Sequence, residues 1–425
     1  MFMRFPKVLI VLAALMSIAS AQTAAKNEVA PKFVTVPITL DQNRVIIDVY
    51  LPLPDGTTKR VRGWVDTGDS ELWMSQRVAG WMGLGVSCDG QMCSGTATAT
   101  PKVVSLEITI GGMKIFLSAM GAVKVPALRP TIAAGMSAEI KIPSSVLRNY
   151  DVLINFPDRE FSIGQPGSLK FKGVKTKMLV NANTGFIRIP SKIEKKSYNL
   201  GLDVGSSISF LSDELFEKLA AAHPDWPHMT GAVGPANVGE LGDDEPKWKL
   251  MRVDRLQYGP LYFTDVAVAE FDKSFSTFFE KQAGGALAGL IGANALMNYR
   301  IGLDYAHSTA YFDLGSTFKF PEFDVVGLIV RPEEDTRFTI LGVADFDGKP
   351  SVPEVLAGDH LIAVDGIPVP DSTMGQVWSL LEGTPGQERK LTVERNGKEF
   401  TVTANVRHFL GEAEEKESQK KSGRK

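Results

Sequence analysis

Two short segments of this 425-residue chain combine an aspartate, a small residue and a glycine. One is Asp66-Thr67-Gly68, which follows the apolar Val65, and the other is Asp203-Val204-Gly205, which follows Leu202. Glycine permits a tight loop, so each aspartate is expected at a loop tip directly after a strand. If the two loops met, their carboxyl groups could not both ionise cheaply and would share a proton. One carboxyl could then accept a proton from water while the other protonates a carbonyl.

The two segments lie in matching order within an internal repeat. The first half of the repeat ends with Asn149-Tyr150 and an apolar run, and the second half ends with Asn298-Tyr299 and another apolar run. We also pair Ala133-Ala134-Gly135 with Leu290-Ile291-Gly292, as an apolar-apolar-glycine element that precedes each ending. Two such loops in register within a repeat are expected to serve one shared site.

Short strands are expected to position these loops. Alternating β-branched and polar residues at 33–36 and 45–49 predict strands, and similar segments divided by Gly and Pro continue to about residue 320. Helices are predicted at Ser144–Tyr150 and at Asp213–Ala222, the latter with Ser212 as its N-cap. The sequence therefore predicts a mainly β protein with two similar β lobes.

At the aspartate loops the sequence resembles the aspartic peptidases of the pepsin and retropepsin type. Residues 66–73 are similar to the Asp-Thr-Gly-Ser-Ser-X-Leu-Trp signature, and residues 203–207 resemble its second copy. The resemblance implies a bilobal pepsin-like fold with lobes at 32–167 and 168–318, and hydrolysis of a peptide or protein substrate. It implies catalytic roles for Asp66 and Asp203 and supporting roles for Thr67, Gly68, Gly205, Ser206 and Ser207.

Three features depart from that family pattern. Val204 stands where a Thr or Ser normally braces the opposite loop, at a cost of roughly 1 kcal/mol for one lost hydrogen bond. Asp69 replaces a small hydroxyl residue and brings a third carboxyl group. Residues 89–98, where the resemblance implies the flap of the first lobe, contain no Tyr of the kind that pepsin-like flaps carry. In the second half, the Gly-rich residues 231–242 lie where retropepsin-like lobes place a flap. A catalytically inactive binding or scaffold protein with a peptidase fold is therefore the alternative.

A third segment follows the repeat. Residues 356–366 resemble the Leu-x-x-Gly-Asp run of the PDZ domains attached to bacterial peptidases. A helix is predicted at 372–381, and a hairpin that turns at Asn396-Gly397 is predicted at Lys390–Val406. The resemblance implies a small PDZ-like domain at 323–410 that binds C-terminal peptides by strand addition. The ligand contacts that it implies are Gly327, Leu328, Ile329, Val330, Val377 and Leu381.

The N-terminus predicts export. Residues 1–21 combine Arg4 and Lys7, an apolar stretch at 8–18 and a small-residue cleavage site, which is typical of a signal peptide. The stretch is too short for a lasting span, so a periplasmic or secreted protein without a membrane span is expected, with an uncleaved anchor as the alternative. The two cysteines, Cys88 and Cys93, would then form a disulfide.

Other classes of function have little support in the sequence. The net charge is −3, so no nucleic-acid partner is expected. The five histidines have no ligand spacing, and we expect neither metal nor cofactor. No Gly-x-Ser-x-Gly elbow or phosphate-binding loop occurs in a suitable context. The charged residues 411–425 predict a disordered tail.

Overall fold

The computed structural model describes residues 31–89, 92–97, 106–117, 123–126, 131–239, 243–315 and 322–411, and for 85–97 we consider the backbone alone. We call residues 32–167 the first half, 168–318 the second half and 322–411 the C-terminal segment. As the sequence predicts, the protein is mainly β. Within the described residues, no helix is long and apolar enough to cross a membrane.

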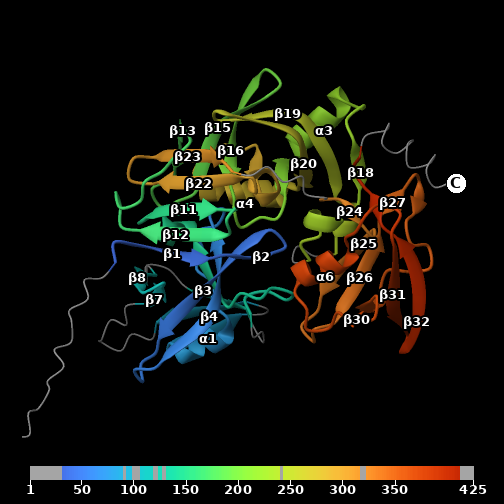
Figure 1. The fold of residues 1–425 in the computed structure, drawn as a ribbon, viewed down its shortest axis with the longest axis horizontal. Coiled ribbons are helices and arrows are strands. Elements are labelled where there is room, and N and C mark those ends of the chain that lie inside the picture. The colour runs from blue at the N-terminus through green and yellow to red at the C-terminus, as the bar shows by residue number, and fades with distance from the viewer. Residues whose placement is uncertain are drawn as a thin grey trace, which may run out of the picture. The chain divides into compact units, whose positions relative to one another are not determined.

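One sheet takes strands from both halves (Figure 1). Its order is β1 (Phe33–Pro37), β12 (Glu160–Gly164), β11 (Asp151–Asn155), β22 (Tyr299–Asp304), β23 (Thr309–Leu314) and β13 (Val174–Lys177). The central strands β11 and β22 are the apolar runs that end the two halves of the repeat. The predicted repeat therefore pairs with itself at the middle of this sheet.

The register between β11 and β22 is symmetric. Asn149 and Asn298 correspond in the repeat, so corresponding residues in the strands that follow them differ in number by 149. Leu153 pairs with Gly302, its own counterpart under this offset. Positions on either side pair reciprocally, so the two strands are related by a local twofold axis.

Each half also has a sheet of its own. In the first half the order is β10 (Ile140–Pro143), β4 (Thr58–Asp66), β3 (Arg44–Pro52), β7 (Glu107–Ile110) and β8 (Met113–Phe116), with β2 (Thr39–Asp41) beside β3. In the second half it is β14 (Leu179–Val180), β15 (Ile187–Ile193), β16 (Lys196–Leu202), β21 (Gly289–Ile291), β17 (Ser209–Ser212), β20 (Leu261–Phe271), β19 (Lys249–Tyr258) and β18 (His228–Thr230). A smaller sheet joins β5 (Leu84–Asp89), β6 (Met92–Ala97) and β9 (Val123–Pro126).

The strands that precede the aspartate loops are held in the same way in both halves. β4 ends at Asp66 and runs parallel to β10, with Val65 opposite Ile142. β16 ends directly before Asp203 and runs parallel to β21, with Leu202 opposite Ile291. The two aspartates therefore leave equivalent points of two equivalent sheets.

This register corrects one expectation from the sequence. The counterpart of Leu290-Ile291-Gly292 is Lys141-Ile142-Pro143, so the pairing with Ala133-Ala134-Gly135 is wrong. The pattern was hidden because Lys141 and Pro143 replace the apolar residue and the glycine. Ala133-Ala134-Gly135 serves elsewhere, since the Gly135 carbonyl accepts a hydrogen bond from the Met374 N–H of the C-terminal segment.

Helices are few and short. The α-helices are α1 (Gln76–Trp81), α2 (Ser144–Leu147), α3 (Asp213–Ala222), α4 (Lys273–Ala283), α5 (Ala293–Leu296) and α6 (Met374–Leu381), and the 3₁₀ turns are Gly234–Ala236 and Glu245–Lys247. The Ser212 hydroxyl caps α3 as predicted by accepting from the Leu215 N–H. Sequence reasoning missed α4, although Asp272 caps its start and Gly284 ends it in the left-handed region.

The C-terminal segment contains a sheet with the order β25 (Leu328–Pro332), β26 (Phe338–Val343), β29 (His360–Val364), β31 (Glu388–Arg395) and β32 (Lys398–Asn405), with β30 (Ile367–Pro368) beside β29. Shorter pairs are β24 (Asp324–Val325) with β33 (Arg407–His408) and β27 (Asp345–Phe346) with β28 (Lys349–Pro350). The hairpin turns at Asn396-Gly397 as predicted, and both residues have positive φ. β25 lies at one end of this sheet.

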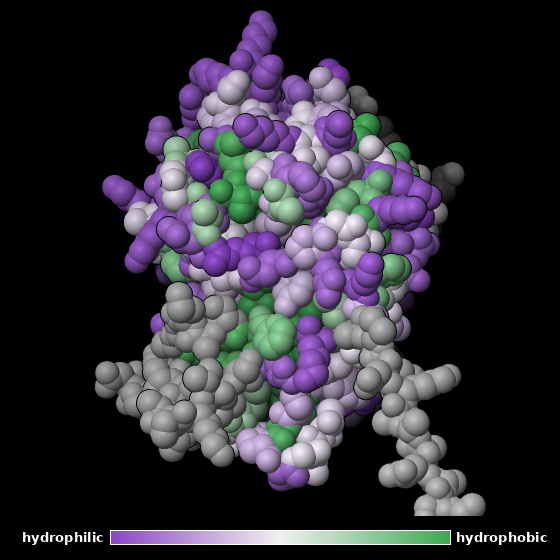
Figure 2. Space-filling model, turned by 90° about the vertical axis from the view of Figure 1, so that its left-hand side faces the viewer, coloured by the Kyte–Doolittle hydropathy of each residue, from purple (hydrophilic) through white to green (hydrophobic). Residues whose placement is uncertain are grey.

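Apolar clusters join these parts. One cluster contains residues of both halves, and a second combines second-half residues such as Phe186 and Val233 with Ile329 and Phe409 of the C-terminal segment. A third lies within the C-terminal segment alone. The face drawn in Figure 2 is mostly hydrophilic, with apolar residues exposed in several separate areas, one of them near its middle. The C-terminal segment is therefore held to the second half by a shared apolar core.

The backbone supports the predicted disulfide but does not test it. Cys88 of β5 and Cys93 of β6 are directly opposite Cα partners, and a disulfide needs such close Cα positions. We predict that thiol titration of denatured, unreduced protein from an oxidising compartment finds no free thiol. Because the loop is short, replacing both cysteines by Ser should lower the free energy of unfolding by less than ~3 kcal/mol. Two reactive thiols would contradict the prediction.

Candidate active site

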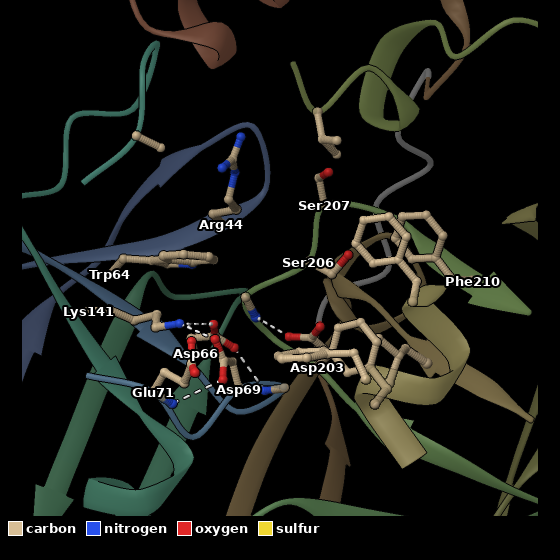
Figure 3. Close-up of a pocket in the computed structure, with 18 of the residues that line it drawn as sticks. Arg44, Trp64, Asp66, Asp69, Glu71, Lys141, Asp203, Ser206, Ser207 and Phe210 are labelled. Atoms are coloured by element: carbon tan, nitrogen blue, oxygen red, sulfur yellow. Dashed lines mark hydrogen bonds and ion pairs between the residues drawn. The ribbon is translucent and has the colours of Figure 1, made fainter. Parts of the chain in front are cut away.

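The structure brings the two aspartate loops together. A Cβ atom on Gly68 would lie 2.3 Å from the Cγ of Asp203, and a Cβ atom on Gly205 would lie 2.6 Å from the Oδ1 of Asp66. Each glycine thus leaves the space that the carboxyl group of the other loop occupies. Asp66 and Asp203, which we call the dyad, lie beside one another at the base of a cavity (Figure 3).

Each dyad carboxyl group is held by its own loop. The Gly68 N–H donates to the Oδ1 of Asp66 at 2.8 Å, and the Gly205 N–H donates to the Oδ1 of Asp203 at 2.9 Å. Both aspartates are buried, at 4% and 6% exposure. The loops therefore fix the carboxyl groups before any ligand is present, as a preorganised site requires.

Thr67 braces the two loops against each other. Its hydroxyl donates to the Leu202 carbonyl at 2.7 Å and accepts from the Val204 N–H at 3.0 Å. Val204 occupies the corresponding position of the second loop, is fully buried and has no hydroxyl to return these bonds. Thr67 therefore forms hydrogen bonds to the Asp203 loop, whereas Val204 cannot form the corresponding bonds to the Asp66 loop. We call this a one-directional brace.

The two serines of the second loop support its shape. The Ser206 hydroxyl donates to the Ile208 carbonyl at 2.8 Å, and the Ser207 hydroxyl donates to the Pro235 carbonyl at 2.7 Å. These bonds position the loop rather than the carboxyl group of Asp203. The bond from Ser207 also ties the loop to residues 234–239, which we call the bridging segment.

A buried lysine, which sequence reasoning missed, lies beside the dyad. Lys141 is 3% exposed, its Nζ pairs with the Oδ2 of Asp69, and it is 3.8 Å from the Oδ2 of Asp66. Asp69 also accepts from the Glu71 N–H at 3.0 Å and from the Gln282 side chain at 3.2 Å. The offset of 149 residues between Asn149 and Asn298 was the available signal, because the same offset leads from Leu290 to Lys141. Figure 3 shows the amine directed at both carboxyl groups.

Burial dominates the electrostatics of the dyad. It raises the pKa of Asp66 to about 6, opposed by the positive charge of Lys141 and reinforced by Asp69. Burial and the neighbouring charge of Asp66 raise the pKa of Asp203 well above its usual value. There is therefore a pH range in which the dyad keeps one proton, as paired carboxyl groups do.

The cavity beside the dyad has two unlike walls and a volume of about 370 Å³. One wall carries charged groups and the indoles of Trp64 and Trp73, whose ring N–H groups have no hydrogen-bond partner among the described residues. The other wall is aromatic and consists of Phe210, Phe271, Phe275, Phe278 and Phe279. Three of these come from α4, which explains why sequence reasoning missed them. An extended chain with an apolar side chain could be held between these walls.

A second groove lies between β25 and α6, and the bridging segment fills it. The Val330 N–H donates to the Oδ1 of Asn237, and the Nδ2 of Asn237 donates to the Val330 carbonyl, both at 2.9 Å. These are the bonds that an added strand would make at this edge. Glu245 holds Asn237 and the Gly239 N–H in place, at 2.6 and 2.8 Å. The cavity volume left in the groove is about 10 Å³.

Comparison with known proteins identifies one part of the chain. Residues 325–406 match the model of the PDZ domain family. The C-terminal segment contains a PDZ domain. The crystal structure of an aspartic proteinase from Irpex lacteus is similar over 67% of this chain and 98% of that chain, at 13% identity and a TM-score of 0.40, which is too low to establish a common fold. No curated protein matches the sequence.

The residues predicted to contact a PDZ ligand do not all line one groove. Leu328, Val330 and Leu381 line the filled groove. Val377 is buried in the core of the domain, and Ile329 lies in the cluster shared with the second half. The Gly327 carbonyl accepts from the Ala344 N–H. A peptide that adds to β25 must therefore displace the bridging segment.

Thr67 should contribute to stability through its two loop-to-loop bonds. Thr67→Val keeps the shape but leaves the buried Leu202 carbonyl and Val204 N–H without this partner, at about 1–3 kcal/mol for each group. We expect the free energy of unfolding in urea to fall by roughly 2 kcal/mol or more. Val204→Thr should not reduce it and should add about 1 kcal/mol if the return bonds form. Equal stability of Thr67→Val and wild type would contradict the role of the brace.

Asn237 should limit peptide binding to the PDZ domain. Asn237→Ala removes two hydrogen bonds at the Val330 edge, each worth about 1 kcal/mol. We therefore expect at least about tenfold tighter binding of a C-terminal peptide selected from a library. Fluorescence titration of the full chain with free-acid and amide forms measures this, with the exposed Asn183→Ala as the matched control. Unchanged affinity, or equal affinity for acid and amide, would contradict the expectation.

Proposed function

We propose that the protein is an exported aspartic endopeptidase with a two-lobed, pepsin-type catalytic unit, in which Asp66 and Asp203 act as one dyad. The observation that carries this proposal is the reciprocal packing of each carboxyl group against the glycine of the other loop. Raised pKa values at both aspartates fit paired carboxyl groups that hold one proton. The proposed location is the periplasm or the extracellular space.

The proposed reaction needs only water and the dyad. The ionised carboxylate takes a proton from water as the water oxygen bonds to the peptide carbonyl carbon. The protonated carboxyl group gives its proton to the carbonyl oxygen, and a gem-diol forms. When the C–N bond breaks, the amide nitrogen takes the proton that came from water, and one diol hydroxyl returns its proton to the dyad. The dyad is then in its starting state.

The cavity supports a substrate that contains apolar side chains. Its aromatic wall offers a large surface to such a side chain, while the dyad faces the polar backbone. The PDZ domain supports a second contact with peptides or proteins. In this proposal the bridging segment links the two sites. The Pro235 carbonyl accepts a hydrogen bond from Ser207 of the Asp203 loop, and the Asn237 side chain is hydrogen-bonded to Val330 at the PDZ edge.

A binding or scaffold protein without catalysis remains the second candidate. The one-directional brace favours it, because Val204 removes the hydroxyl that would complete the loop contact. The filled PDZ groove does not distinguish the two candidates, since a peptidase could also be held inactive in this way. Cleavage activity separates them.

The two aspartates should be equally indispensable for cleavage. Asp66→Asn and Asp203→Asn should each abolish hydrolysis of a diverse peptide mixture, because either the base or the acid is lost. The double variant should be no worse than either single variant, as for residues that act as one unit. Mass spectrometry across acidic to neutral pH, with and without a statine-type inhibitor, measures this. The exposed Asp225→Asn serves as the matched control.

Near-wild-type cleavage by either single variant would contradict a shared dyad. Absence of cleavage by wild type at every pH would favour the binding protein.

A further inference from the structure

The charged wall of the cavity contains a cation at an unexpected place. Lys141 corresponds to Leu290 of the second half, and both residues line the cavity. The two halves therefore differ here by a full positive charge. Burial of an ammonium group costs free energy unless the group is paired. We therefore expect Lys141 to have an effect that an apolar residue could not have.

The surroundings of Lys141 hold its amine close to one member of the dyad. Its Nζ pairs with Asp69 and lies 3.8 Å from the Oδ2 of Asp66. The rings of Trp64 and Trp73 flank it, with centroids 5.6 and 5.2 Å away.

Among the described residues, the other charged groups in this region are not paired with the amine of Lys141. Arg44 and Glu71 line the same cavity, and Asp203 lies across the dyad. Glu139, which directly precedes β10, pairs instead with Arg77 at 2.7 Å.

Asp69 and Lys141 act on Asp66 with opposite signs. The ammonium favours ionisation of Asp66 and Asp69 opposes it, and the effect of Lys141 is the larger of the two. At the corresponding place beside Asp203, the second half provides Leu290 and aromatic rings. The field across the dyad is therefore uneven.

We propose that Lys141 is a positioning residue that assigns the roles within the dyad. Its ammonium keeps Asp66 as the ionised member, so that Asp66 takes the proton from water and Asp203 carries the proton given to the carbonyl oxygen. Asp69 holds the amine in place and limits its effect. The assignment of catalytic roles rests on the proposed peptidase function, whereas the effect of Lys141 on the ionisation of Asp66 does not.

The test follows the ionisation of the two aspartates directly. Protein labelled with ¹³C at aspartate Cγ is titrated by NMR, and Asp66→Asn and Asp203→Asn assign the two signals. An opposite charge within about 4–6 Å shifts a carboxyl pKa by roughly 1–3 units. Lys141→Met should therefore raise the titration midpoint of Asp66 by at least about one unit.

Three further variants make the test specific. Asp69→Asn should lower the midpoint of Asp66, and Lys141→Arg should leave it near the wild-type value. Lys141→Met/Asp69→Asn, which removes both charges, should give a midpoint between those of its single variants. If Lys141→Met fails to fold, Lys141→Gln, which also removes the positive charge, gives the same upward test.

Peptide cleavage by the same variants gives the second readout. The acidic limb of the pH–rate profile should move with the midpoint of Asp66, upward in Lys141→Met and downward in Asp69→Asn. An unmoved midpoint in Lys141→Met overturns the proposal, whatever the activity. Shifted midpoints in a protein that cleaves nothing would support the effect on Asp66 and refute the peptidase function. Shifted midpoints with an unmoved acidic limb would overturn the assignment of Asp66 as the base.

Discussion

Two buried carboxyl groups share one small space, and much of the surrounding structure serves to make this possible. Asp66 and Asp203 leave equivalent strands, and each fits only because the opposite loop has a glycine. The symmetric register of β11 and β22 relates the two halves that carry these loops. Thr67 then joins the loops through two hydrogen bonds. Like charges in such a position repel each other, so retention of a shared proton is the physical outcome.

The asymmetry of the site is as informative as its symmetry. Thr67 has no hydroxyl counterpart at Val204, and Lys141 has an apolar counterpart in Leu290. One wall of the cavity is therefore charged and the other aromatic. The bridging segment of the second half adds a further asymmetry, because it contacts both the Asp203 loop and the PDZ edge. The Asp203 loop and the PDZ edge are therefore connected through one short piece of chain.

Local signals in the sequence predicted much of this arrangement. The repeat, the two glycine-containing loops, α3 with its cap and the hairpin at Asn396-Gly397 could all be found because each depends on neighbouring residues. Lys141, Gln282 and the phenylalanines of α4 could not be found in this way, since only long-range pairing brings them to the dyad. The incorrect pairing of Leu290-Ile291-Gly292 with Ala133-Ala134-Gly135 has the same cause, because the correct partner is identified by strand pairing. The 149-residue offset between Asn149 and Asn298 leads instead to Lys141-Ile142-Pro143. The filled groove also depends on tertiary contacts alone.

The central claim is that burial and proximity raise the pKa values of both aspartates in the folded protein. Such a carboxyl group binds more protons when folded, so stability falls as pH rises from about 4 through its raised pKa. The direct measurement is the free energy of unfolding of wild type and Asp66→Asn/Asp203→Asn between pH 4 and 8. The account predicts a small difference at pH 4 and a growing advantage of the variant at higher pH. Asp66 alone should contribute on the order of 3 kcal/mol, from a pKa raised from 3.8 to about 6. A difference that does not change with pH would contradict the account.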